Sequence, residues 1–275
     1  MKTVLITGTT NGIGRVTALE LARAGHRIVM ANRNREKSET LAQEITEQTG
    51  NTAIELLDLD LASLASVRAC AAAFREKHGQ LDILLNNAGM TSMEEVITED
   101  GYELQFAVNA LAQLLLTLEL QPALEAAAPS QVIFVTSMMH KFGKLNPDSF
   151  RGWKKYSGGA SYNQSKLAMM LLARELADRF EPKGIKVNTL HPGAVNTGIL
   201  DEYPPIAQFF LRRIFIAPEK GAKTSLYLAG QSPDDLPNGK YFVNCKPAKT
   251  NPGVEDASLR QQLWDTCCAY LGVAA

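Results

Sequence analysis

The stretch Val4-Leu5-Ile6-Thr7-Gly8-Thr9-Thr10-Asn11-Gly12-Ile13-Gly14 decides how this chain folds. Its first four residues form the short apolar run that is typical of a buried parallel strand. Three glycines follow, and apolar residues at helical spacing then continue to Gly25. A strand, a glycine-rich turn and a helix in this order form the first unit of a dinucleotide-binding fold, in which the helix N-terminus faces a diphosphate.

The glycines of this turn have the spacing Gly-x-x-x-Gly-x-Gly, whereas the common dinucleotide-binding fingerprint has one residue between its first two glycines. A glycine turn that binds nothing is the alternative, and the strand and helix on either side argue against it. We predict that the turn contacts a cofactor through Gly8, Thr10, Asn11, Gly12, Ile13 and Gly14.

The second expected strand, His26–Asn32, ends 18 residues after Gly14 and runs into Arg33. An acidic residue at this strand end would bind the adenosine ribose of NAD(H), and none is present. The guanidinium of Arg33 suits the 2′-phosphate of NADP(H) through charge-assisted hydrogen bonds, and Arg15 is close enough in sequence to assist. We expect NADP(H) to be preferred and NAD(H) to be possible; a solvated basic loop is the alternative.

Helical and strand patterns alternate along the rest of the chain. Expected strands are 52–57, 81–85, 131–137, 184–190 and 240–243, and expected helices are 36–48, 64–78, 99–124, 162–180, 218–229 and 255–271. This order predicts one α/β domain over residues 1–275, a doubly wound Rossmann-type domain with a mostly parallel seven-stranded sheet flanked by helices. Ligands of such sheets bind beyond the carboxyl ends of the strands.

Candidate cofactor contacts follow several of these strand ends. They are Asp58, Leu59, Asn87, Ala88, Gly89, Pro192, Gly193, Val195 and Thr197. Asp58 has two interpretations, since it suits the adenine amino group and is also close to the start of the helix near Ser63. His191 lacks an acidic partner in the sequence, and we expect it to be a satisfied loop residue rather than a catalyst.

Tyr162 and Lys166 are four residues apart at the start of a helical pattern, so their side chains share one face. An ammonium about 4 Å from a phenol at an effective dielectric constant of ~20 contributes about 4 kcal/mol. This is roughly three pKa units in favour of the phenolate, which brings a phenol near the range where acid–base catalysis is efficient. A packed tyrosine with a neighbouring surface lysine is the alternative.

Two segments are candidates for substrate contact. The connection 138–160 is long and carries Phe142, Phe150, Trp153 and Tyr156, which form either a lipophilic wall or a local cluster. The segment 199–216 is apolar and partly basic, and we expect it to be a lid over the substrate, with peripheral membrane contact as the weaker alternative.

Composition excludes several classes of function. The 275 residues carry 28 basic and 29 acidic side chains, a net charge of −1 that does not favour binding to nucleic acid. The four cysteines lack metal-ligand spacing, so we expect no metal and reduced thiols in a cytoplasmic protein. The sequence has neither an evident signal peptide nor an uninterrupted apolar run of membrane-spanning length. A homo-oligomer is possible.

The chain resembles the short-chain dehydrogenase/reductase family over its whole length. The matching motifs are Thr7-Gly8-x-x-x-Gly12-Ile13-Gly14, Asn86-Asn87-Ala88-Gly89, Asn109, Ser137, Tyr162-x-x-x-Lys166 and Pro192-Gly193. Within the family it is similar to the retinol dehydrogenase-like, NADP(H)-preferring branch. The segments that carry this likeness are Ala31–Arg33, Tyr162–Ala168, Arg174–Ala177 and Gly239–Cys245.

The resemblance implies an oxidoreductase that interconverts a lipophilic aldehyde or ketone and its alcohol, with Tyr162 as general acid or base. Ser137 would bind the substrate oxygen, Lys166 would hold the nicotinamide ribose, and Asn109 would hold a water that links Lys166 to solvent. A protein that only senses NADP(H) or binds a partner is the second hypothesis, against which the complete set of four residues argues. A lyase or epimerase on the same scaffold is the third, and no residue favours it.

Overall fold

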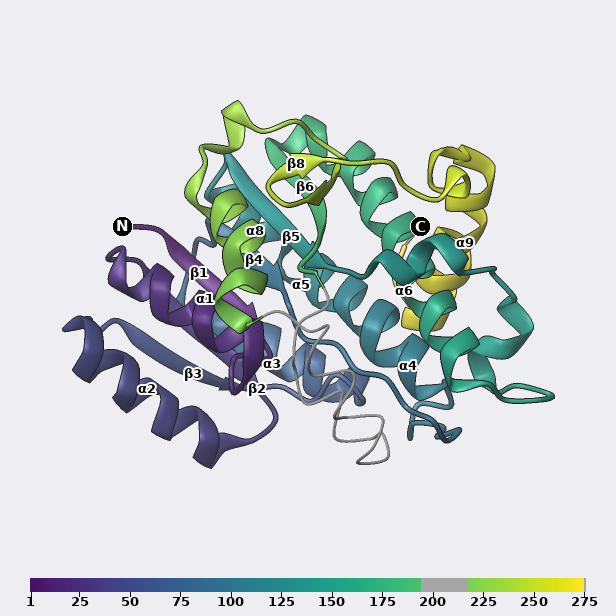
Figure 1. Cartoon of the computed structure of the whole chain (residues 1–275), viewed down its shortest axis with the longest axis horizontal. Coiled ribbons are helices and arrows are strands. Elements are labelled where there is room, and N and C mark those ends of the chain that lie inside the picture. The colour runs from purple at the N-terminus through teal and green to yellow at the C-terminus, as the bar shows by residue number, and fades with distance from the viewer. Residues whose placement is uncertain (194–216, 275) are drawn as a thin grey trace.

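A computed structural model of the chain describes residues 1–193 and 217–274, and its central sheet contains the strand quoted above as β1 (Thr3–Thr7) (Figure 1). Side chains of β1 alternate between the two faces of the sheet, with Val4 and Ile6 on one face and Leu5 on the other. Because helices cover both faces, every one of these positions is apolar. The expected lid at 199–216 lies outside the described residues.

Within the described residues the sheet has the strand order β3-β2-β1-β4-β5-β6-β7-β8. Seven strands are parallel, which confirms the predicted doubly wound α/β sheet. The strands that follow β1 are β2 (Arg27–Asn32), β3 (Ile54–Asp58), β4 (Ile83–Asn86), β5 (Ser130–Val135), β6 (Ile185–His191) and β7 (Tyr241–Val243).

The eighth strand, β8 (Lys246–Pro247), was not predicted and pairs antiparallel with β7 at the edge of the sheet. Asn244 and Cys245 form the turn between them, with φ angles of 50° and 63°. Two consecutive left-handed residues are typical of a tight hairpin turn, which usually contains glycine. Asn-Cys is not such a signal and β8 has only two residues, so no sequence pattern predicts this strand.

Helices form a layer on each face of the sheet (Figure 1). The apolar cluster on one face includes side chains of α1, α2 and α8, and the cluster on the other face includes those of α3, α5, α6 and α9. Their bounds are α1 (Gly12–Arg23), α2 (Arg35–Thr49), α3 (Leu64–Lys77), α4 (Leu104–Phe106), α5 (Ala112–Ala126), α6 (Gly158–Phe180), α8 (Pro218–Gly230) and α9 (Ala257–Leu271).

Strand order reverses at β1, which lies between β2 and β4. The chain first moves outward from β1 to β3 and then returns to the opposite side of β1 at β4. Connections therefore diverge above the carboxyl ends of these two strands, and such a point is where doubly wound sheets bind ligands. The glycine turn follows β1, and Asn87 follows β4, at this same point.

The helix expected at 99–124 begins later and is not uniform. Glu103 caps α4 by accepting hydrogen bonds from the backbone N–H groups of Gln105 and Phe106. A five-residue π-helical turn, η1 (Ala107–Leu111), then connects α4 to α5 and contains Asn109. Gly101 precedes this cap with a φ of 81°, so the chain at residues 99–101 turns instead of forming the first helical turn. Single π turns inside α-helices are frequent at functional sites.

The continuous helical stretch Leu104–Ala126 is the one helix in the described part of the chain that is long and apolar enough to cross a membrane. It has 23 residues and a mean hydropathy of 1.2 in its most apolar window, of which 78% is buried inside the protein. Packing of this stretch against the sheet, α3 and α6 accounts for its composition, because core helices have the same apolar character.

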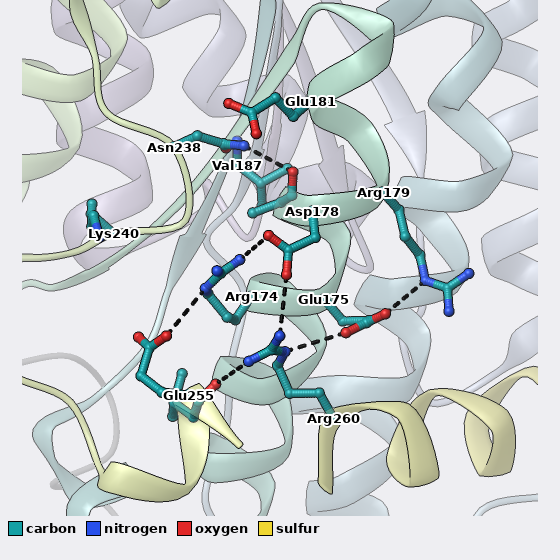
Figure 2. Close-up of polar contacts among 12 residues, drawn as sticks. Arg174, Glu175, Asp178, Arg179, Glu181, Val187, Asn238, Lys240, Glu255 and Arg260 are labelled. Atoms are coloured by element: carbon teal, nitrogen blue, oxygen red, sulfur yellow. Dashed lines mark hydrogen bonds and ion pairs between the residues drawn. The ribbon is translucent and has the colours of Figure 1, made fainter. Parts of the chain in front are cut away.

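Ion pairs fasten the C-terminal helix α9 to α6 (Figure 2). Arg260, which is 7% exposed, contacts Glu175 at 3.2 Å and Asp178 at 3.2 Å, and its Nη1 donates to the carbonyl of Val254 at 3.0 Å. Arg179 lies on the other side of Glu175, with a nitrogen–oxygen distance of 2.9 Å. Every charged group at the centre of this contact therefore has a partner of opposite charge.

Arg260→Leu should reduce the free energy of unfolding by about 2 kcal/mol, because it removes charged hydrogen bonds to Glu175 and Asp178, which then keep only Arg179 and Arg174 as partners among the described residues. Arg35→Ala is the matched control, since the Arg35–Glu39 pair is exposed and pairs of that kind contribute about 1 kcal/mol or less. Urea unfolding at neutral pH measures both losses. Equal losses of unfolding free energy in the two variants would contradict a larger contribution from the buried ion pairs of Arg260.

Candidate active site

Close backbone contact between the glycine turn and the end of β4 forms the floor of the site. Gly8 and Gly12 have φ angles of 69° and 54°, in the left-handed region that favours glycine. A Cβ atom on Gly14 would lie 2.2 Å from the carbonyl oxygen of Gly8 and 2.5 Å from Nδ2 of Asn87. A Cβ atom on Gly8 would lie 2.9 Å from the Cα of Ala88. The predicted residues Gly8, Gly14, Asn87 and Ala88 are therefore brought together.

Side chains from three strands hold this turn in place. Asn87 Nδ2 donates to the carbonyls of Thr7 and Gly8 at 2.8 and 3.0 Å, and Thr7 Oγ1 accepts from the backbone N–H groups of Asn87 and Ala88. Asn32 is buried at the end of β2, where it accepts from the backbone N–H of Thr9 at 2.7 Å and donates to Thr9 Oγ1. The supporting roles of Thr7 and Asn32 were missed, because their partners lie far away in sequence.

The N-terminus of α1 is open toward the site. Asn11 is its N-cap but makes no side-chain capping bond, whereas Asn34, Ser63 and Ser157 cap α2, α3 and α6 through their side chains. Asn11 itself is exposed. The first N–H groups of α1 are consequently available to an anionic ligand, to which a helix N-terminus adds a partial positive charge.

Thr10 and Ile13 complete the predicted turn and differ in their surroundings. Thr10 is half-buried at the surface of the turn. Ile13 is 6% exposed and packs against Ala222 of α8. Its side chain belongs to the core, so any contact with a cofactor would come from its backbone.

Arg33 follows β2 and is exposed, and it makes neither a hydrogen bond nor an ion pair with the described residues. Arg15, expected to assist it, instead contacts Glu44 of α2 at 2.6 Å. A guanidinium that is already paired with a carboxylate has less capacity for a second anion. The basic character of this strand end therefore rests on Arg33 rather than on Arg15.

Asp58 and Leu59 at the end of β3 also have different surroundings. The carboxylate of Asp58 is 75% exposed and lies 3.7 Å from Nη1 of Arg35. Ser63, not Asp58, caps α3, which removes the capping interpretation of Asp58. Leu59 is 4% exposed in the core, and its backbone N–H donates to the carbonyl of Asn32 at 3.0 Å.

Lys166 and Asn109 meet at Gly89. A Cβ atom on Gly89 would lie 3.1 Å from Nζ of Lys166 and 3.3 Å from Oδ1 of Asn109, so glycine leaves room for both groups. Asn109 Oδ1 accepts from the backbone N–H of Met90, and its Nδ2 donates to the carbonyl of Met90 and to Ser165 Oγ. Asn109 thus joins the π turn to the loop after β4 and to α6.

The ammonium of Lys166 is buried beside Tyr162. Lys166 is 4% exposed, and its Nζ donates to the carbonyl of Val135 at 3.4 Å and lies 5.8 Å from the centre of the Tyr162 ring. Tyr162 is half-buried on the same face of α6, as the spacing predicted. Burial lowers the pKa of Lys166 from 10.5 to about 8, so the group still carries most of its charge at neutral pH.

Ser137 follows β5, the strand whose last carbonyl contacts Lys166. It is half-buried, and its Oγ accepts from the backbone N–H of Met139 at 3.3 Å in the short helix η2 (Met138–Phe142). Gly143, just after η2, packs on α6: a Cβ there would lie 2.5 Å from the carbonyl oxygen of Asn163. The segment that begins with Ser137 therefore rests directly on the helical turn that carries Tyr162.

The turn after β6 is described only in part. Pro192 and Gly193 are half-buried, and Gly193 has a φ of 93°. Val195 and Thr197 lie outside the described residues. Nδ1 of His191 is buried and has no hydrogen-bond partner among the described residues, so they do not confirm the expected satisfied loop residue. Burial lowers the pKa of His191 to about 4, so this imidazole is neutral at physiological pH.

A model of the short chain dehydrogenase family matches residues 2–205. The chain belongs to the short-chain dehydrogenase family. Human retinol dehydrogenase 14 is 37% identical over 291 residues, which cover 99% of this chain and 87% of that protein. An uncharacterized protein from Mycobacterium Paratuberculosis is similar in structure, with a TM-score of 0.81 and 30% identity over 99% of this chain and 94% of the other. The Pseudomonas aeruginosa RhlG/NADP active-site complex has a TM-score of 0.72 and 25% identity, covering 88% and 93% of the two chains.

These comparisons confirm the resemblance to retinol dehydrogenase-like members of the short-chain dehydrogenase family. They make the chain an oxidoreductase that acts on CH–OH groups with a nicotinamide cofactor. The glycine turn fits such a cofactor, since the uncapped N-terminus of α1 suits a diphosphate and the glycine at position 89 leaves space beside Lys166.

The aromatic residues of 138–160 do not act as one group in this short-chain dehydrogenase. Phe150 is fully buried and stacks on Phe106 at a centroid distance of 3.9 Å. The hydroxyl of Tyr156 accepts from Gln105 Nε2 at 2.8 Å, whereas Phe142 is 64% exposed. Phe150 is thus part of the core, and neither a common wall nor a single cluster describes the set.

Titration of Lys166 should be visible in the stability of the enzyme without cofactor. Between pH 8 and 10.5 the unfolded chain binds up to one proton more than the folded chain, so the stability of the wild type should rise with pH relative to Lys166→Met. The expected gain is about 3 kcal/mol, at 1.36 kcal/mol per pKa unit. Urea unfolding of both proteins across this range measures it. A constant difference between them would contradict a lowered pKa.

Proposed function

We propose that this protein is an NADP(H)-dependent oxidoreductase that interconverts a lipophilic aldehyde or ketone and the corresponding alcohol. The observation that carries the proposal is the buried Lys166 ammonium beside Tyr162, on a helix that packs against the segment beginning with Ser137. A buried cation next to a phenol favours the phenolate and so makes the phenol a better proton donor. Core packing alone gives no reason to bury an ammonium at this position.

Each of the three side chains has a separate task. Tyr162 donates a proton to the carbonyl oxygen during reduction and removes it from the alcohol during oxidation. Ser137 donates a hydrogen bond to the same oxygen and orients it. Lys166 supplies positive charge and holds the nicotinamide ribose. The bound nicotinamide supplies or accepts the hydride.

Asn109 is proposed to bind a water that connects Lys166 with solvent. Its Oδ1 and the Nζ of Lys166 both face the open side of Gly89, which supports a shared contact at that point. Its amide already binds Met90 and Ser165, and these bonds fix the direction of the Oδ1 atom. A fixed acceptor beside an ammonium is a suitable site for an ordered water.

Preference for NADP(H) over NAD(H) is supported by the surroundings of β2. Arg33 is exposed without a partner among the described residues. Asn32 hydrogen-bonds to the backbone N–H and the hydroxyl of Thr9. A solved relative with 25% identity binds NADP, as its title states. The basic residue available at this strand end suits a 2′-phosphate, whereas a carboxylate would suit the ribose of NAD(H).

The lipophilic substrate is supported by the likeness to retinol dehydrogenase 14, whose name indicates an apolar alcohol. We also propose a cytoplasmic location, in line with the four cysteines, all of which have free thiols.

A panel of aldehydes and ketones of increasing chain length, assayed with NADPH at the nicotinamide absorbance, tests the reaction. Turnover should favour the apolar members, and Tyr162→Phe should reduce kcat at least 100-fold with little change in the Kd for NADPH, because general acid–base groups contribute about 10²–10⁴-fold. Tyr156→Phe is the matched control and should keep most of the activity. If the wild type turned over no compound of the panel, the result would favour a protein that only binds NADP(H).

Arg33→Ala should weaken NADPH binding by roughly 1.5–3 kcal/mol, the scale of hydrogen bonds to charged groups, and should leave NADH binding nearly unchanged. Arg35→Ala is the control, since that guanidinium is paired with Glu39 and lies near Asp58. Fluorescence titration of both cofactors gives the four affinities. Equal losses for NADPH and NADH in Arg33→Ala would exclude the 2′-phosphate assignment.

A further inference from the structure

His140 is a fully buried histidine that directly holds the backbone of Ser137. Its Nδ1 lies 2.7 Å from the carbonyl oxygen of Ser137, and its backbone N–H donates to the same oxygen at 3.2 Å. A carbonyl oxygen only accepts hydrogen bonds, so Nδ1 must carry the ring proton. Burial lowers the pKa of His140, so the imidazole is neutral at physiological pH and donates from Nδ1 alone.

The backbone of Ser137 needs such a contact because the sheet no longer constrains it. The register between β5 and β6 ends at Val135 and Leu190, and the N–H of Thr136 makes the last bond to the carbonyl of Leu190. Ser137 is the next residue and lies outside the ladder, and its carbonyl accepts from the backbone N–H and the ring N–H of His140. Its Oγ accepts from the backbone N–H of Met139, which leaves the hydroxyl hydrogen to donate elsewhere.

His140 is itself held rigidly. Its ring meets the ring of Tyr241 edge-on, at a centroid distance of 4.9 Å and an interplanar angle of 75°. The carbonyl of His140 accepts from the backbone N–H of Gly143 at 3.2 Å, and Gly143 packs on the carbonyl of Asn163 in α6. The segment from Ser137 to Gly143 is therefore fixed at both ends, against β7 and against the helix of Tyr162.

We propose that His140 is a positioning residue for the reaction: its Nδ1–H holds the carbonyl of Ser137 and so sets the direction of the Ser137 hydroxyl toward the substrate oxygen. This inference rests on the proposed function, in which Ser137 binds that oxygen. His140 does not touch the substrate oxygen in this scheme and acts only through Ser137. It adds a fifth side chain, which the sequence did not single out, to the four already assigned to the site.

Two substitutions distinguish the effect of the ring N–H donor on kcat from the effect of side-chain size. His140→Asn places an amide N–H near the position of Nδ1, whereas His140→Gln places it near the position of Nε2. We expect His140→Asn to keep kcat within about threefold of the wild type and His140→Gln to reduce it at least tenfold. The KM for NADPH should change by less than about twofold in both, because β4 separates β1, which leads into the glycine turn, from β5, which leads into η2.

A double-mutant cycle with Ser137→Ala tests whether His140 acts through Ser137. The variant Ser137→Ala/His140→Gln should be no more than about twofold slower than Ser137→Ala alone, since the hydroxyl to be positioned is already absent. Multiplicative losses of kcat in the double variant would overturn the inference and indicate a structural role. Equal kcat values for His140→Asn and His140→Gln would overturn it as well.

The kcat values of Ser137→Ala and His140→Gln distinguish failure of the proposed function from failure of the inference about His140. If Ser137→Ala retained wild-type kcat, the role of Ser137 would be wrong and the positioning of its hydroxyl would fall with it. If Ser137→Ala lost activity but His140→Gln did not, only the inference about His140 would fall. Urea unfolding of every variant ensures that a loss of kcat is not a loss of folded protein.

Discussion

A buried ammonium imposes the strongest constraint on this structure. Transfer of a charge from water to a protein interior is costly unless polar groups replace the lost hydration. Around Lys166 the described replacements are few: the carbonyl of Val135 and the neighbouring ring of Tyr162. The lowered pKa of Lys166 reflects this incomplete compensation. Apolar packing of α6 elsewhere stabilises the fold and offsets the cost, since most of the helix is buried on several sides.

Glycine placement is a second constraint on the site. A side chain at position 89 would crowd the space that Lys166 and Asn109 share, and one at position 14 would separate α1 from Asn87. Both contacts join elements that are distant in sequence, so the glycines determine how closely the helices and strand ends approach one another. The site is thus defined by the absence of side chains at a few positions as much as by the polar groups themselves.

Sequence patterns predicted the elements whose chemistry depends on local spacing. The glycine turn follows from its glycine spacing, the seven parallel strands from apolar runs, and the shared face of Tyr162 and Lys166 from a step of four residues. Residues with distant partners were not predicted: Asn32 supports a turn 23 residues away, and the pairing of Arg15 with Glu44 depends on how α1 meets α2. Such contacts exist only after the sheet has formed, and a single sequence does not show which distant residues will meet.

The distance between Ser137 and Tyr162 depends on packing that neither residue makes. Ser137 belongs to a strand end and Tyr162 to a helix, and two such elements can slide past each other unless something joins them. Gly143 joins them here, because its backbone lies against the carbonyl of Asn163, the residue next to Tyr162. At the other end of α6, the ion pairs of Arg260 hold the helix against α9. Because α6 is held at both ends, Tyr162 has little freedom to move. The position of the Ser137 hydroxyl relative to Tyr162 therefore depends on the orientation of the Ser137 backbone.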